Sequence, residues 1–72
     1  MSLDELRAAH DEIDGLDLLS AEGHAEAERR HQAYYDALGE ALGYEKSDTG
    51  TWVDPQGLAP NVAMMEARLA LD

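Results

Sequence analysis

The sequence has no cysteine, no phenylalanine, two prolines and only five Lys or Arg residues. Without cysteine, the chain can form no disulfide framework. Sixteen Asp and Glu residues give a formal net charge of −11, which opposes direct binding to the phosphates of DNA or RNA. No apolar run approaches the ~20 residues of a membrane span. We therefore expect a soluble, cytoplasmic protein that contacts neither nucleic acid nor membrane directly.

The length of 72 residues predicts one small acidic helical domain over residues 1–72. A chain of this size buries only about 60% of its unfolded surface, so its core contributes little net stability. The aromatic side chains are Trp52, Tyr34, Tyr35 and Tyr44. We therefore expect marginal stability for the isolated chain and added stability in contact with a partner or a second copy.

The first helix is expected to start at Ser2. Ser2 and Glu5 have the spacing of a capping box, in which both side chains satisfy free N–H groups of the first turn. Leu6, Ile13 and Leu16 recur at helical spacing. A glycine costs about 1 kcal/mol in a helix relative to alanine, so Gly15 weakens or ends this one.

Residues 21–42 carry the strongest helical signal, because they are rich in Ala, Glu, Arg and Leu. Ser20 is expected to be the N-cap. Gly43 is expected to end the helix in a left-handed conformation, with Tyr44 packing against the last helical turn. The Gly39 and Gly43 spacing indicates a close approach combined with a cap rather than a dimer face.

Residues 44–53 predict a β-hairpin, because a Ser-Asp-Thr-Gly turn separates short segments that favour extended structure. An isolated hairpin is marginal in water, so Trp52 must pack on the helices or on a partner. A third short helix is expected to begin with Pro60 at its first position, and the segment 61–71 carries its apolar face. The predicted fold is thus mostly α, a helical hairpin plus a short C-terminal helix. Its expected core is Leu6, Ile13, Leu16, Leu19, Tyr34, Leu38, Leu42, Trp52, Val62, Met65 and Leu69.

One candidate metal site lies on the second helix. His24, Glu28 and His31 are spaced to leave one helix face, and two imidazoles with a carboxylate can bind zinc, iron or manganese. His10 could approach as a fourth ligand if the first two helices pair. The alternatives are partly buried histidines bonded to a carbonyl or carboxylate, or a pH-sensitive seam. No other cofactor motif is present.

Residues 3–14, Leu-Asp-Glu-Leu-Arg-Ala-Ala-His-Asp-Glu-Ile-Asp, resemble the opening of the all-helical chorismate mutases. The resemblance implies that Arg7 would contact a substrate carboxylate. The sequence departs from that family at Gly15 and Gly23, which interrupt what would be a long first helix, and it lacks the further basic residues around a dicarboxylate.

The remaining candidate site is the surface, and we do not expect an enzyme, because acid–base work requires desolvated carboxylates that so small a chain can hardly provide. Rows of carboxylates on helices imitate the charge of a nucleic-acid backbone. We expect a non-catalytic module that masks the basic, nucleic-acid-binding surface of a larger protein. Phage or mobile-element inhibitors such as anti-CRISPR and anti-restriction DNA mimics are similar in size and charge. The expected contact residues are Asp4, Glu5, Asp11, Asp14, Glu22, Glu26, Asp36, Glu40, Tyr35 and Met64.

The alternative is a structural or assembly subunit of a virus or a halophile. In that case the charge serves solubility, and uncovered apolar residues such as Tyr35, Met64 and Leu71 form a homo-oligomer contact.

Overall fold

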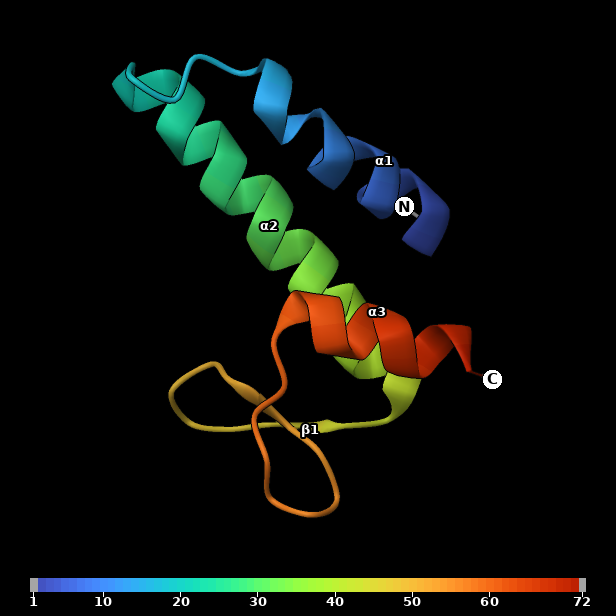
Figure 1. Cartoon of the computed structure of the whole chain (residues 1–72). Helices are drawn as coiled ribbons and strands as arrows, with labels where there is room; N and C mark the ends of the chain where they lie inside the picture. Colours follow the sequence, from blue (N-terminus) through green and yellow to red (C-terminus); the bar gives the residue numbers. More distant parts are fainter. Residues whose placement is uncertain (1, 72) are drawn as a thin grey trace. The chain divides into compact units, whose positions relative to one another are not determined.

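The computed structural model describes residues 2–71 and is mostly helical, as predicted (Figure 1). Its elements are α1 (Leu3–Asp11), the 3₁₀ helix η1 (Glu12–Gly15), α2 (Ala21–Leu42), β1 (Glu45–Lys46), β2 (Trp52–Val53) and α3 (Val62–Ala70). The chain divides into two compact units, residues 1–34 and 35–72, and α2 contributes to both. No helix within residues 2–71 is long and apolar enough to cross a membrane.

In the first unit, α1 begins where the sequence predicts. The hydroxyl of Ser2 accepts a hydrogen bond from the backbone N–H of Glu5 at 3.3 Å, which satisfies one of the free donors of the first turn. The helix tightens after Asp11 into η1, which ends at Gly15. The first part of α2 then runs back alongside α1 (Figure 1), so the predicted helical hairpin is present in this unit.

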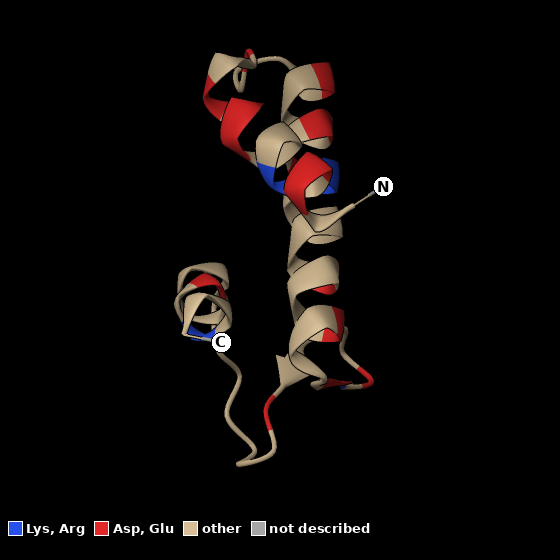
Figure 2. Ribbon diagram, turned by 90° about the vertical axis from the view of Figure 1, so that its right-hand side faces the viewer, with Lys and Arg blue, Asp and Glu red and all other residues tan. Residues whose placement is uncertain are grey.

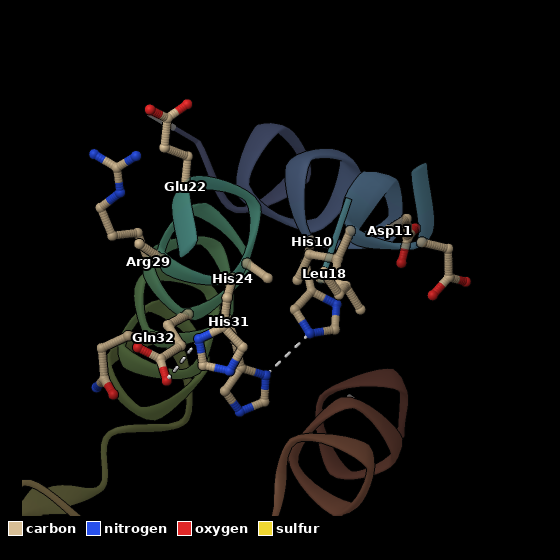
Figure 3. Close-up of a pocket in the computed structure, with 13 residues that line it drawn as sticks. His10, Asp11, Leu18, Glu22, His24, Arg29, His31 and Gln32 are labelled. Atoms are coloured by element: carbon tan, nitrogen blue, oxygen red, sulfur yellow. Dashed lines mark hydrogen bonds and ion pairs between the residues drawn. The ribbon is translucent and has the colours of Figure 1, made fainter. Parts of the chain in front are cut away.

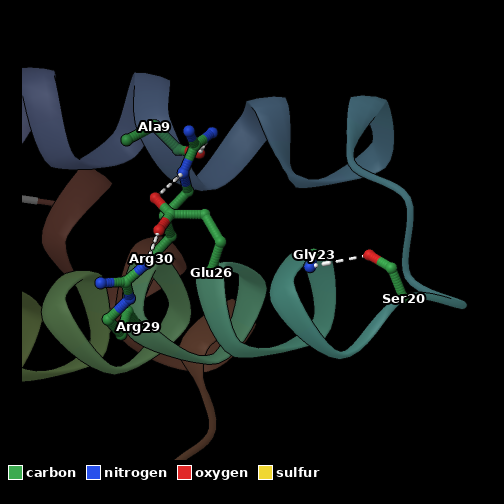
Figure 4. Close-up of polar contacts among 6 residues, drawn as sticks. All are labelled: Ala9, Ser20, Gly23, Glu26, Arg29 and Arg30. Carbon is green, nitrogen blue, oxygen red and sulfur yellow. Dashed lines mark hydrogen bonds and ion pairs between the residues drawn. The ribbon is translucent and has the colours of Figure 1, made fainter.

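The ends of α2 agree with the predicted bounds because each end has its own cap. At the N-terminus, the hydroxyl of Ser20 accepts from the N–H of Gly23 at 3.0 Å (Figure 4). At the C-terminus, Gly43 has φ 75°. Its N–H donates to the carbonyl of Glu40 at 3.1 Å, and the N–H of Tyr44 donates to that of Gly39 at 3.0 Å. These two bonds form a Schellman motif.

In the second unit, the predicted β-hairpin is confirmed. Lys46 pairs with Trp52, and Glu45 with Val53, in antiparallel register. The turn is closed by a hydrogen bond of 3.0 Å from the N–H of Gly50 to the carbonyl of Ser47. Gly50 has φ 85°, a conformation that glycine adopts without strain.

Trp52 packs on the second part of α2, which is one of the two predicted ways of covering it. A Cβ atom on Gly39 would lie 2.1 Å from Cδ2 of the indole, so the ring occupies the space of the missing side chain. The indole N–H donates to Oδ1 of Asp36 at 2.8 Å. The backbone N–H of Trp52 donates to the hydroxyl of Tyr35 at 2.7 Å. The two bonds hold the hairpin on α2.

The prediction that Pro60 is the first residue of α3 is wrong, because Asn61 is the N-cap. Asn61 is extended, with φ −81° and ψ 175°, and its side chain accepts from the N–H of Met64 at 2.9 Å. Pro60 therefore precedes the cap. Proline has no backbone N–H that needs an acceptor, so it can precede the N-cap as well as lie in the first turn.

Four predicted core residues are buried: Tyr34, Leu38, Trp52 and Met65. The prediction for Leu19 is wrong, since its side chain is 99% exposed. Leu19 lies in the turn between η1 and α2, where its N–H donates to the carboxylate of Asp17 at 3.1 Å. The turn directs Leu19 into solvent, outside the stripe that Leu6, Ile13 and Leu16 form. The other predicted core residues are half-buried: Leu6, Ile13, Leu16, Leu42, Val62 and Leu69.

Candidate functional site: an acidic groove in the first unit

An open groove lies in the first unit, between α1 with η1 on one side and the first part of α2 on the other (Figure 3). Ile13 and Leu18 are the large apolar residues of its lining. Ile13 is half-buried, whereas the side chain of Leu18 is 47% exposed. The groove therefore presents apolar surface to solvent, which a partner could cover.

Carboxylates surround this apolar surface. Asp11, Asp14, Glu22 and Glu28 belong to the lining, and all four are exposed. Residues 1–34 contain nine Asp or Glu and three Arg, which leaves a formal net charge of −6. Figure 2 shows the acidic residues along α1 and the start of α2. The groove, which we call the acidic groove, therefore lies in a negative field.

Arg30 joins the two helices that form the acidic groove (Figure 4). Its Nε donates to Oε1 of Glu26 at 2.9 Å, and one terminal nitrogen donates to the carbonyl of Ala9 in α1 at 3.2 Å. Arg29 also pairs with Glu26. The pKa of Glu26 lies below its ordinary value, chiefly because Arg30 donates a hydrogen bond to the carboxylate. Glu26, expected to contact a partner, is thus engaged within the unit.

The histidines form two separate pairs. His10 Nε2 and His31 Nδ1 lie 3.2 Å apart across the two helices (Figure 3), and the His10 ring also contacts the ring of Tyr34. His24 Nδ1 lies 3.6 Å from Oε1 of Glu28. Among residues 2–71, no three His, Asp or Glu side chains are grouped as metal ligands would be. The predicted set His24, Glu28 and His31 is therefore divided between the two pairs.

The remaining residues expected to contact a partner fall into two groups. Asp4, Glu5, Glu40 and Met64 are exposed. Tyr35 and Asp36 are half-buried and hold Trp52, and Asp36 also pairs with Lys46 at 3.3 Å. The side chains of Tyr35 and Asp36 are therefore engaged in contacts within the second unit.

Sequence reasoning missed the role of Asp54 in the second unit. Its Oδ1 accepts from the backbone N–H groups of Gln56 and Leu58, each at 2.9 Å. Its Oδ2 accepts from Arg68 at 2.8 Å, and the same Arg68 nitrogen donates to the hydroxyl of Tyr44 at 3.0 Å. The N–H of Leu58, followed by Arg68, lowers the pKa of Asp54. The Asp-Pro-Gln-Gly sequence was the available signal, because Asp side chains often bond to the backbone of the turn they begin.

The structure does not extend the likeness to chorismate mutases. α1 has nine residues and ends at Asp11, so the long first helix of that family is not formed. No protein-family model matches the sequence, and neither a curated protein nor a solved structure is significantly similar to it.

Proposed function

We propose that the chain is a non-catalytic acidic module that binds a basic, nucleic-acid-binding surface of a larger protein and masks it. The observation that carries this proposal is the acidic groove, in which exposed carboxylates border exposed apolar surface. A partner's Lys and Arg residues suit both features at once. Their charged ends pair with carboxylates, while their methylene stems cover apolar side chains.

The exposure of the carboxylates supports binding rather than catalysis. A general acid or base needs a site from which water is largely excluded, so that its pKa is tuned to the reaction. Asp11, Asp14 and Glu22 are exposed, which suits electrostatic attraction over a distance. Such attraction speeds association and weakens as salt screens it.

The test uses DNA-binding proteins from the organism that encodes the sequence. The immobilised module is incubated with the extract fraction that binds DNA-cellulose, and captured proteins are eluted with duplex DNA. We expect a protein that duplex DNA releases and whose affinity for the module falls about tenfold or more between about 50 and 200 mM salt. A complex that is indifferent to salt, or that tolerates duplex DNA, would contradict the proposal.

A matched pair of charge variants locates the contact. Replacing Asp11 and Glu22 by Asn and Gln removes two carboxylates from the acidic groove. The control replaces two exposed carboxylates of the second unit, Asp48 and Glu45, by Asn and Gln, so both variants change the net charge equally. The groove variant should lose most of the affinity and the control little. Equal losses would mean that net charge alone drives the binding.

A second candidate function, an assembly subunit, is favoured by exposed apolar side chains in α3 and at its C-cap. Met64 and Leu71 are 46% and 87% exposed, and a second copy of the chain could cover them. This function predicts an oligomer in sedimentation at high protein concentration. A species that stays monomeric there would reject it.

A further inference from the structure

His10 in α1 and His31 in α2 face each other across the helical hairpin of the first unit (Figure 3). Their facing nitrogens, Nε2 and Nδ1, lie 3.2 Å apart, and the ring centroids lie 5.3 Å apart. We propose that these two imidazoles bind a divalent transition-metal ion, such as Zn²⁺ or Cu²⁺, which bridges the two helices. This proposal does not depend on the proposed partner binding.

The separation of the nitrogens suits a shared ion. Imidazole nitrogens bind zinc at about 2.0–2.1 Å, so two nitrogens 3.2 Å apart subtend an angle of about 100° at the metal. This angle is close to that of a tetrahedral site. The two histidines supply two ligands from different helices, and water completes the coordination. Within residues 2–71, no third His, Asp or Glu side chain is grouped with this pair as a further ligand.

The ion takes the place of the proton that the two rings now share. In the neutral pair, one facing nitrogen donates and the other accepts. Both nitrogens become ligands when the donor ring shifts its proton to its other nitrogen, which points away from the metal. Neutral imidazoles therefore bind the ion without a net loss of protons.

The surrounding charge favours a cation and the donor atoms favour a transition metal. Residues 1–34 carry a formal net charge of −6, from nine acidic and three basic residues, and Asp11 and Glu28 line the same groove. This field raises the local concentration of any cation. Imidazole selects Zn²⁺, Cu²⁺ or Ni²⁺ over Mg²⁺ and Ca²⁺, which prefer oxygen ligands.

His24 provides the matched control. It lies on the same helix as His31 and is exposed, but its Nδ1 lies beside Glu28 at 3.6 Å rather than beside another histidine. Replacing His24 by Gln removes one imidazole without touching the proposed site. The variants His10→Gln and His31→Gln each remove one proposed ligand.

The test measures melting temperature with ZnCl₂, with MgCl₂ and after addition of EDTA. An ion that binds the folded chain alone raises Tm. At zinc roughly tenfold above Kd, a chain of this size should gain roughly 5–10 °C. We expect this rise in the wild type and in His24→Gln, its reversal by EDTA, and its loss in His10→Gln and His31→Gln. MgCl₂ should leave Tm unchanged. No rise in the wild type, or a rise that survives in both proposed-ligand variants, would overturn the proposal.

A second measurement needs no variant and stays informative if a substitution prevents folding. Imidazole ¹⁵N shifts of the wild type, recorded by two-bond ¹H–¹⁵N NMR during zinc titration, identify the metal-bound nitrogens directly. We expect the largest changes at Nε2 of His10 and Nδ1 of His31. Changes centred on His24 would overturn the proposal and assign the ion to the His24, Glu28 and His31 face instead.

Discussion

Replacing Gly39 by alanine should destabilise the second unit, although the same change in most helices is stabilising. Alanine is favoured over glycine in a helix interior by about 1 kcal/mol. At Gly39, however, the new Cβ would lie 2.1 Å from Cδ2 of Trp52 and 2.5 Å from Cε3 and Cγ. The indole would have to withdraw by more than an ångström to reach ordinary contact.

The indole cannot withdraw without loss, because its N–H is bonded to Asp36 at 2.8 Å and the neighbouring backbone N–H to Tyr35 at 2.7 Å. Overpacking of this kind costs about 1–3 kcal/mol, and each weakened hydrogen bond adds about 1 kcal/mol. After the helical gain is subtracted, we expect Gly39→Ala to lower the free energy of unfolding by about 1–3 kcal/mol.

The assay is urea denaturation followed by circular dichroism and by fluorescence of Trp52, the single tryptophan. Gly15→Ala serves as the control, since a Cβ at Gly15 meets nothing within 4 Å, and it should be neutral or slightly stabilising. In a Trp52→Leu background, Gly39→Ala should lose most of its cost. A Gly39→Ala protein that is more stable than the wild type, with unchanged emission, would refute the reasoning.

Two further predictions concern single polar groups. Ser20→Ala removes the acceptor for the N–H of Gly23, so it should lower the free energy of unfolding by about 1 kcal/mol in urea denaturation. An unchanged urea midpoint would show that water replaces the cap at no cost. In the folded chain the pKa of Asp54 lies below its ordinary 3.8, chiefly because the N–H of Leu58 and then Arg68 donate hydrogen bonds to its carboxylate. The unfolded chain therefore binds more protons than the folded chain. The free energy of unfolding falls as the pH drops below about 4. Asp54→Asn should therefore be less stable than the wild type at pH 7, and the gap in urea midpoints should narrow below about pH 4; a gap that stays constant with pH would contradict this.

The sequence predicts those features whose determinants are local. The bounds of α2 follow from Ser20 and Gly43, because each residue caps its end of the helix through contacts within four residues. The hairpin follows in the same way from its turn. Gly39 was predicted only in part. Its spacing from Gly43 indicated a close approach, but only the structure identifies Trp52 as the neighbour.

The candidate site was predicted only in part, because it depends on how α1 and α2 are paired. Helical spacing correctly places His24 and His31 on α2, but it does not say which of them meets His10. The pairing is fixed by contacts between residues far apart in sequence, such as Arg30 with the carbonyl of Ala9. Asp54 and Arg68 were missed for the same reason, since fourteen positions separate them.

The pairing of the basic side chains has a consequence for the colloidal behaviour of the protein. Arg29, Arg30, Lys46 and Arg68 each pair with a carboxylate of their own chain. The chain still carries a formal net charge of −11, and this charge opposes the approach of identical copies at low salt. Added salt screens this repulsion between copies of the chain. Ionic strength should thus bring copies of the chain together under the same conditions in which it separates the chain from a basic partner.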